Sequence, residues 1–120
     1  MSELYSVPAT GGAVVKLNGP LVTNGNVVAS SGFKIGALDN RVVYRSDQEV
    51  DERRELFSVS ITGGPSVKIS SSFTAGGNVG HFRLTPDNRH VLYLADQDTD
   101  GMTELFETLA RSEERRVGKG

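Results

Sequence analysis

The sequence contains no cysteine, which excludes a disulfide framework but leaves the cellular compartment open. No apolar stretch approaches the roughly 18 residues of a membrane-spanning helix, and Met1 precedes an acidic polar segment that does not resemble a signal peptide. The formal net charge is only -2, so no basic surface indicates binding to nucleic acid or to an anionic membrane. We therefore expect that the protein neither binds nucleic acid nor inserts into a membrane.

Motifs for catalysis are missing as well. Serines are abundant, yet no Gly-x-Ser-x-Gly elbow occurs, so a nucleophilic triad has no support. The glycine-rich segment 76–80 has neither the Lys-Ser/Thr of a phosphate loop nor the spacing of a dinucleotide fold. His81 and His90 are the only histidines, and no cysteine accompanies them to mark a metal site. The sequence therefore predicts a protein that is not an enzyme.

What the sequence does contain is typical of short strands joined by tight turns. It has 14 glycines, three tyrosines and five phenylalanines, together with recurring clusters of valine and isoleucine. Branched and aromatic residues favour strands, whereas glycine favours the turns between them. The composition therefore predicts an all-β protein.

An internal repeat runs through most of the chain. Glu-Leu-Tyr-Ser-Val at residues 3–7 recurs as Glu-Leu-Phe-Ser-Val at 55–59 and in part as Glu-Leu-Phe at 104–106, at steps of 52 and 49 residues. Other segments keep the same step: Thr10-Gly11-Gly12 with Thr62-Gly63-Gly64, Asn26-Val27 with Asn78-Val79, Tyr44 with Tyr93, and Asp47-Gln48 with Asp96-Gln97. A period of about fifty residues indicates repeated supersecondary units.

Each unit is expected to have four strands joined by hairpins. In the complete copy the hydrophobic pattern predicts strands over 27–35, 41–46, 55–60 and 66–70. Val42 and Tyr44 should share one face of the second strand, with Val43 on the other. The copy is longer around residues 29–32, which indicates an insertion or a bulge.

The phase of the repeat divides the chain into four parts. Residues 1–25 supply the third and fourth strands of one unit, 26–75 form a complete unit, and 76–110 supply the first three strands of another. The expected fold is roughly two and a half four-stranded antiparallel units. Residues 111–120 match no position of the repeat. They resemble the translation of a sequencing adapter, and we expect them to be an artefact. The other interpretation is a solvated charged tail whose Glu and Arg pairs form a short helix.

These residues resemble the TolB-type, WD-like β-propeller repeat, in which each blade runs Phe-x-hydroxyl-Pro-Asp-Gly, a hydrophobic strand with Tyr, an acidic loop, Glu-Leu-Tyr and a Gly-Gly turn. Residues 82–88, 91–93, 96–101 and 104–106 carry the match, and the resemblance spans residues 3 to about 108. Two positions depart from the pattern. Asn88 stands where the family has Gly, and Leu38 stands where it has Pro.

The resemblance implies a partial propeller of four-stranded blades that acts as a non-catalytic platform for a protein or peptide partner. The resemblance also implies that the protein lies in the periplasm or the cell envelope or is secreted. Two alternatives stay open. The blades of this type also precede the hydrolase domain of enzymes similar to prolyl oligopeptidase, and a calcium-stabilised repeat protein of the cell surface would have acidic loops like those in this chain.

The acidic loop that begins at Asp96 is the candidate metal site. Asp96, Asp98 and Asp100 occupy alternate positions and Gly101 follows, which is the order of hard oxygen ligands in a calcium loop. Glu104 is a nearby fourth carboxylate. Because strands and not helices flank the loop, it is not an EF-hand, and the other interpretation is a solvated acidic hairpin. Calcium is the only cofactor that the sequence indicates.

Overall fold

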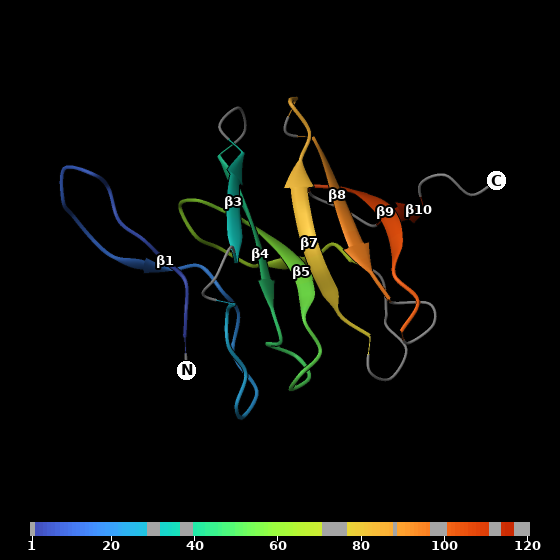
Figure 1. Ribbon diagram of the computed structural model, residues 1–120. Coiled ribbons are helices and arrows are strands. Elements are labelled where there is room, and N and C mark those ends of the chain that lie inside the picture. The colour runs from blue at the N-terminus through green and yellow to red at the C-terminus, as the bar shows by residue number, and fades with distance from the viewer. Residues whose placement is uncertain are drawn as a thin grey trace.

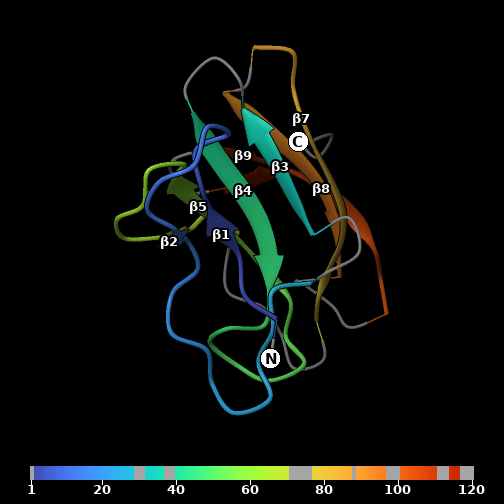
Figure 2. The same cartoon turned by 90° about the vertical axis from the view of Figure 1, so that its left-hand side faces the viewer.

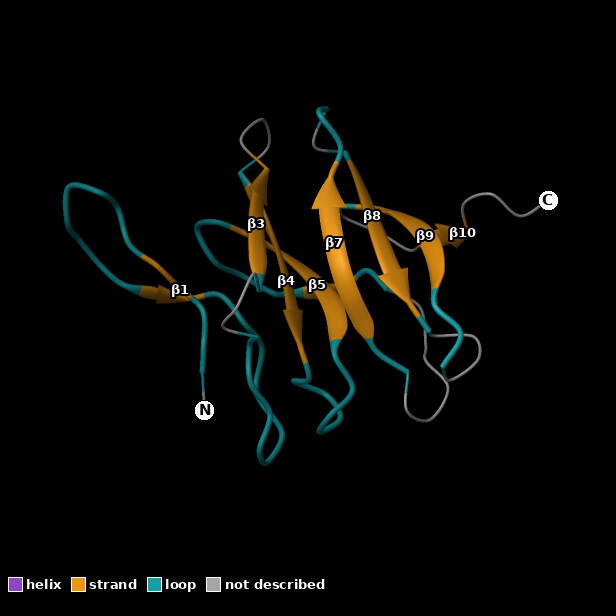
Figure 3. Cartoon of the chain, in the orientation of Figure 1, coloured by secondary structure: helices purple, strands orange, loops and turns teal. Residues whose placement is uncertain are grey.

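The computed structural model describes residues 2–28, 32–36, 40–70, 77–87, 89–96, 101–110 and 114–116. Within these ranges every regular element is a β-strand and no α-helix is present (Figure 3). The strands form three antiparallel sheets, one of two strands and two of four strands. The all-β prediction is therefore confirmed. The residues described include no helix with the length and apolarity needed to span a membrane.

The central sheet contains β3 (Phe33–Gly36), β4 (Arg41–Ser46), β5 (Glu55–Ser60) and β6 (Val67–Lys68) in sequential order (Figure 1). The bounds predicted for the second and third strands are confirmed. The strand predicted over 27–35 is wrong in its extent, because the strand begins at Phe33 and Val27 forms only an isolated bridge with Ser46. The insertion expected at 29–32 falls mostly outside the described residues.

A second four-stranded sheet repeats this arrangement with β7 (Val79–Leu84), β8 (His90–Ala95), β9 (Glu104–Leu109) and β10 (Glu114–Arg116). The two-stranded sheet pairs β1 (Tyr5–Ser6) with β2 (Val15–Lys16). Arg116 lies opposite Phe106 in β9, just as Lys68 lies opposite Phe57 in β5. Residues 114–116 thus pair at a repeat position, while the expectation that 111–120 are an artefact stays a prediction.

Alternation of side chains along each strand gives every sheet two apolar faces. Tyr44 stacks on its cross-strand neighbour Phe57 with ring centroids 5.5 Å apart and planes inclined by 21°. Tyr93 and Phe106 in the next sheet have the same separation and the same inclination. Offset stacking of this kind adds to the burial of the rings. The repeat therefore extends from the sequence to the geometry of the core.

The core consists of two clusters, and each is built from side chains of two consecutive sheets. The ribbons of these sheets lie one behind the other in Figure 2, with β1 in front of β4 and β9 behind it. In the first cluster, Leu4 and Leu17, which flank the strands of the two-stranded sheet, meet Val42, Tyr44 and Phe57 of the central sheet. In the second, the central sheet contributes the side chains of its opposite face. These are Val43, Leu56 and Ile69, which meet Val79, Phe82, Val91, Tyr93, Ala95, Phe106 and Ala110. One kind of interface thus occurs twice. Val43 lies on the opposite face of the central sheet from Val42 and Tyr44, so the predicted division of these side chains is confirmed.

Polar contacts around the third and fourth strands are also repeated. Glu3 pairs with Lys16 at 3.1 Å between carboxylate oxygen and Nζ, and Glu55 pairs with Lys68 at 3.4 Å. The first pair lies at the surface, whereas the Glu55 side chain is only 2% exposed. Burial raises the pKa of Glu55, and the positive charge of Lys68 offsets only part of that rise. The same pair of residue types therefore has a different electrostatic balance in the two sheets.

The Gly-Gly turns supply backbone angles that other residues rarely adopt. Gly63 has φ of +100° and Gly64 of +108°, and Gly11 and Gly12 also have positive φ. A Cβ added at Gly63 would lie 2.7 Å from Cγ1 of Val15, a residue of the preceding sheet. Gly63 is therefore required both by the turn and by the close approach of its neighbour.

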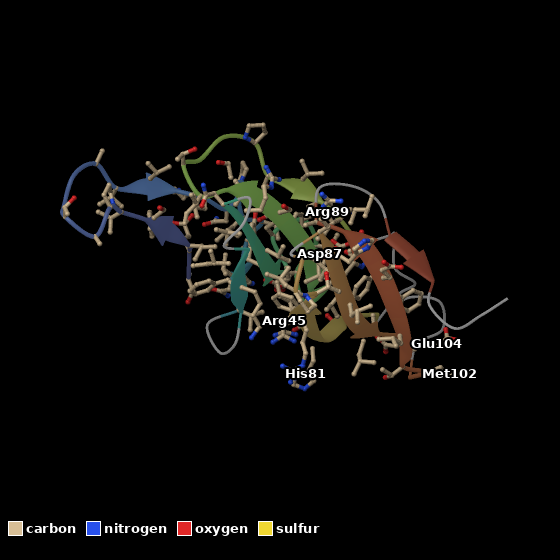
Figure 4. The ribbon with its side chains drawn as sticks, turned by 90° about the horizontal axis from the view of Figure 1, so that it is seen from above. Arg45, His81, Asp87, Arg89, Met102 and Glu104 are labelled. Carbon is tan, nitrogen blue, oxygen red and sulfur yellow. The ribbon has the colours of Figure 1, made fainter. Side chains whose placement is uncertain are left out.

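The turn between β7 and β8 lies at one end of the second sheet, where Asp87 and Arg89 are labelled in Figure 4. The Asp87 carboxylate accepts hydrogen bonds from the Thr85 hydroxyl at 2.6 Å and from the Arg89 backbone N–H at 3.0 Å. These two bonds lower the pKa of Asp87. Such local bonding explains why a Thr-Pro-Asp sequence makes a tight turn here.

Candidate functional site

The turns that follow β4 and β8 lie at the same end of the two sheets, because both strands point in the same direction in Figure 1. Each turn begins with an aspartate, Asp47 or Asp96, and each has a residue with positive φ five positions later. Glu52 has φ of 66° and Gly101 has φ of 82°. We call this end of the sheets the aspartate rim.

Asp47 uses both of its carboxylate oxygens to fix the backbone. Oδ1 accepts a hydrogen bond from the N–H of Asn26 at 2.7 Å, and Oδ2 accepts one from the N–H of Glu52 at 2.9 Å. The residue is 6% exposed. Hydrogen bonds to an ionised acceptor are stronger than neutral ones, and here they close the turn and hold the segment that leads into the sheet.

Asp96 makes the same two contacts in the next sheet. Its Oδ1 accepts from the N–H of Asn78 at 2.8 Å, and its Oδ2 accepts from the N–H of Gly101 at 3.0 Å. The two aspartates therefore bind equivalent backbone groups, and the six-residue turns that they begin are identical at three positions. A glutamate and a glycine occupy the position that needs positive φ, and only the glycine adopts that angle without steric cost.

The asparagine in each unit extends the contact to the preceding sheet. Oδ1 of Asn26 accepts from the N–H of Ser2, and Oδ1 of Asn78 accepts from the N–H of Arg54 at 2.7 Å. The backbone reinforces both contacts, with Val27 N–H donating to Ser2 O at 2.9 Å and Val79 N–H donating to Arg54 O at 2.8 Å. We call the two sets, Ser2-Asn26-Asp47 and Arg54-Asn78-Asp96, the Asp–Asn clasps. Each clasp ties one sheet to the next.

A cleft of about 350 Å³ opens at the aspartate rim. It is lined by Ser2, Asn26, Val27, Val28, Asp47 and Arg54. Its walls therefore include all three members of the first clasp and the arginine that belongs to the second. Because the clasps fix the backbone on both sides, the polar groups of the cleft are held in place before any ligand arrives.

A second arginine lies close to this region. The Arg45 guanidinium donates from Nη1 to the carbonyl of Val79 at 3.2 Å and also to the carbonyl of Gly80, so it bridges β4 and β7 near His81 (Figure 4). Burial lowers the pKa of Arg45, and the positive charge of Arg54 lowers it further. Two guanidinium groups that interact in this way create a positive potential beside the cleft, which favours a carboxylate or another anionic group.

Two of the four predicted calcium ligands, Asp96 and Glu104, lie within the described residues. Both oxygens of Asp96 already accept backbone N–H groups, and Glu104 lies at the start of β9 opposite Ala95. Asp98 and Asp100 lie outside the described residues. Among the residues that are described, no group of three or more acidic, histidine or cysteine side chains is placed to hold a metal ion. The calcium site stays a prediction, and the clasp gives Asp96 a structural role that the motif alone did not reveal.

A scan against protein-family models and a search of the curated proteins both found no match to this chain. The geometry of the clasps and of the cleft therefore carries the functional argument.

Proposed function

We propose that this chain is part of a β-propeller similar to the TolB type, in which the sheets are successive blades. Support comes from the two core clusters, in which one face of each sheet packs on the opposite face of the next sheet and the contact is built from repeat-equivalent residues both times. It also comes from the two Asp–Asn clasps, which join consecutive sheets through the same atoms. A repeated interface with a fixed rotation is what generates a radial array.

We propose further that the array is a non-catalytic platform and that a peptide segment of a protein partner binds in the cleft at the aspartate rim. The cleft carries the proposal because its lining combines Asn26 and Asp47, which the first clasp holds in place, with the cation of Arg54. An extended peptide presents alternating N–H and C=O groups, so it can pair with such a mixed polar wall. A carboxylate of the peptide would occupy the space next to Arg54.

The test is selection of peptides from a random dodecamer library displayed on phage, with the 120-residue chain as bait. Selected peptides are then titrated into the chain by calorimetry. We expect enriched peptides to carry an acidic residue or to bind through their C-terminal carboxylate. Arg54→Glu should weaken their binding by about a hundredfold, because an attractive charge becomes a repulsive one at the centre of the site.

Arg89→Glu is the matched control, since it makes the same charge change at the exposed turn on the opposite end of the sheet. It should leave the affinity within about twofold of the original value. If no peptide is enriched, or if enriched peptides bind the Arg54→Glu variant as tightly as the parent chain, the cleft is not the binding site.

A further inference from the structure

The two-stranded sheet has an open edge. β1 pairs with β2 on one side, and among the residues that the structure describes no strand pairs with β1 on the other side. The N–H of Leu17 donates to the carbonyl of Leu4 at 2.8 Å, so the backbone groups of these two residues face each other. Because backbone groups alternate in direction along a strand, those of Tyr5 and Val7 point to the open edge. An edge of this kind can pair with an added strand.

An apolar groove lies beside this edge. Its volume is about 260 Å³, and its lining comes from β1, β3, β4 and the residues that flank them. In Figure 2, β1 crosses in front of β4, with β2 on one side of it and β3 on the other. Apart from Ser6, the lining residues are apolar: Leu4, Tyr5, Val7, Leu17, Phe33, Ile35, Val42 and Ile61.

Phe33 and Ile35 are the exposed apolar residues that β3 contributes to the groove. They lie opposite Tyr44 and Val42 on β4, and cross-strand partners share one face of a sheet. The two-stranded sheet covers this face only in part. Val42 is 2% exposed beneath it, whereas Phe33 is 46% exposed and Ile35 is 52% exposed. The cover therefore ends before it reaches β3.

The repeat shows what fills the equivalent position against the second four-stranded sheet. Phe82 is the counterpart of Phe33, because each lies opposite the stacked tyrosine of its sheet, yet Phe82 is only 5% exposed. Val43 of β4 belongs to the cluster that buries Phe82, and Nζ of Lys34 lies 6.0 Å from the centroid of the Phe82 ring. β4 pairs with β5, which is the counterpart of β1. The place that β4 fills beside β5 is therefore the place that is open beside β1.

We propose that an extended peptide segment of a partner protein adds to the open edge of β1 and lays branched aliphatic side chains on Phe33 and Ile35. In strand addition of this type the main chain supplies affinity and alternate side chains supply specificity. The register of β4 on β5 sets the expected pattern, with a tyrosine opposite Tyr5 and a valine opposite Ser6 that points into the groove. The groove shares no lining residue with the cleft at the aspartate rim, so this site goes beyond the function proposed above and does not depend on it.

Calorimetric titration of the chain with a capped hexapeptide tests the proposal. The peptide Arg-Val-Val-Tyr-Arg-Ser has the sequence of residues 41–46, and acetyl and amide caps leave it without a carboxylate that could bind at the aspartate rim. We expect one peptide to bind per chain. N-methylation of the peptide tyrosine should weaken binding by about tenfold or more, because this N–H would donate to the carbonyl of Tyr5. N-methylation of the valine before it is the matched control and should change the affinity by no more than about twofold, since that N–H points away from β1.

Substitutions in the chain locate the peptide. Ile35→Glu should weaken binding by about tenfold or more, because it places a charge in the apolar groove. Leu94→Glu puts the same charge at an exposed position of β8 and should leave the affinity within about twofold of the original value. Arg54→Glu should also leave it unchanged, which distinguishes the groove from the cleft at the aspartate rim. Far-ultraviolet circular dichroism verifies that each variant is folded.

Four outcomes would overturn the proposal. They are the absence of peptide binding, equal binding of the two N-methylated peptides, binding that a folded Ile35→Glu variant retains, and binding that Leu94→Glu weakens as much as Ile35→Glu does. If Arg54→Glu abolishes binding, the peptide lies in the cleft, and this proposal fails while the proposed function stands. A chain that associates with itself in sedimentation and does not bind the peptide assigns the edge to a second copy, which also overturns the proposal.

Discussion

Replacing Asp47 by asparagine should destabilise the fold, because it weakens the first Asp–Asn clasp. The carboxylate accepts two backbone N–H groups, from Asn26 and Glu52, and the residue is 6% exposed. Asparagine keeps one acceptor oxygen, but its NH₂ group then faces the other N–H. One hydrogen bond to a charged group is lost and a buried donor is left unpaired, which costs about 2–4 kcal/mol of unfolding free energy.

The measurement is urea unfolding of the chain, followed by near-ultraviolet circular dichroism of its buried tyrosines. Asp51→Asn makes the same charge change at an exposed position of the same turn and should alter the unfolding free energy by no more than about 0.5 kcal/mol. Asp96→Asn should also destabilise the fold but cost less than Asp47→Asn, because the second clasp has the same bonds while Asp96 is only partly buried. If Asp47→Asn and Asp51→Asn cost the same, the clasp does not stabilise the fold as argued.

Three further substitutions test other features of the repeat. Leu56→Ala should cost about 2–5 kcal/mol of unfolding free energy, whereas Leu105→Ala should cost less than about 1 kcal/mol, since only the first side chain is fully buried. Equal losses of unfolding free energy in urea would contradict the repeated interface. Burial raises the pKa of Glu55 above its ordinary value of 4.5. The parent chain should therefore be most stable relative to Glu55→Gln below pH 4.5, and it should lose that advantage as the pH rises through the raised pKa. Unfolding curves at several pH values measure the difference in unfolding free energy, and a difference that grows with pH would refute the reasoning. Gly63→Ala should lower the free energy of unfolding by about 1–3 kcal/mol, because φ is +100° and the new Cβ would meet Val15. Thermal unfolding measures the change, and an unchanged midpoint temperature would show that the turn relaxes freely.

Much of the strand pattern followed from the sequence. The bounds of β4 and β5 were predicted correctly, because both strands are buried and carry short runs of branched and aromatic residues. The first strand of the central sheet was placed too early. Val27 is apolar and buried, but it contributes to the contact with the preceding sheet through its N–H bond to Ser2 and makes only a single bridge to β4. Hydrophobic periodicity cannot distinguish these two uses of a buried valine.

The candidate site was only partly predictable. The repeat marked Asn26 with Asn78 and Asp47 with Asp96 as equivalent pairs, and the acidic pattern after Asp96 indicated a metal loop. The groups that these carboxylates bind are backbone N–H groups, which every residue except proline has, so no sequence motif records them. The cleft also depends on Arg54, which lies in sequence far from Ser2 and Asn26. Only the packing of consecutive sheets brings these residues together.

The Asp–Asn clasp has a consequence for how the turns of the aspartate rim can change. The aspartate fixes where each turn starts and how many residues it spans, and it binds main-chain atoms at both points. In the first turn, Gln48 is buried against Tyr44 and Glu49 pairs with Lys68, but Val50 and Asp51 are exposed. The identity of these last two residues can therefore be altered without loosening the junction between sheets. The rim thus separates a fixed frame from interchangeable contact residues, and new binding specificities could be selected there at little cost to folding.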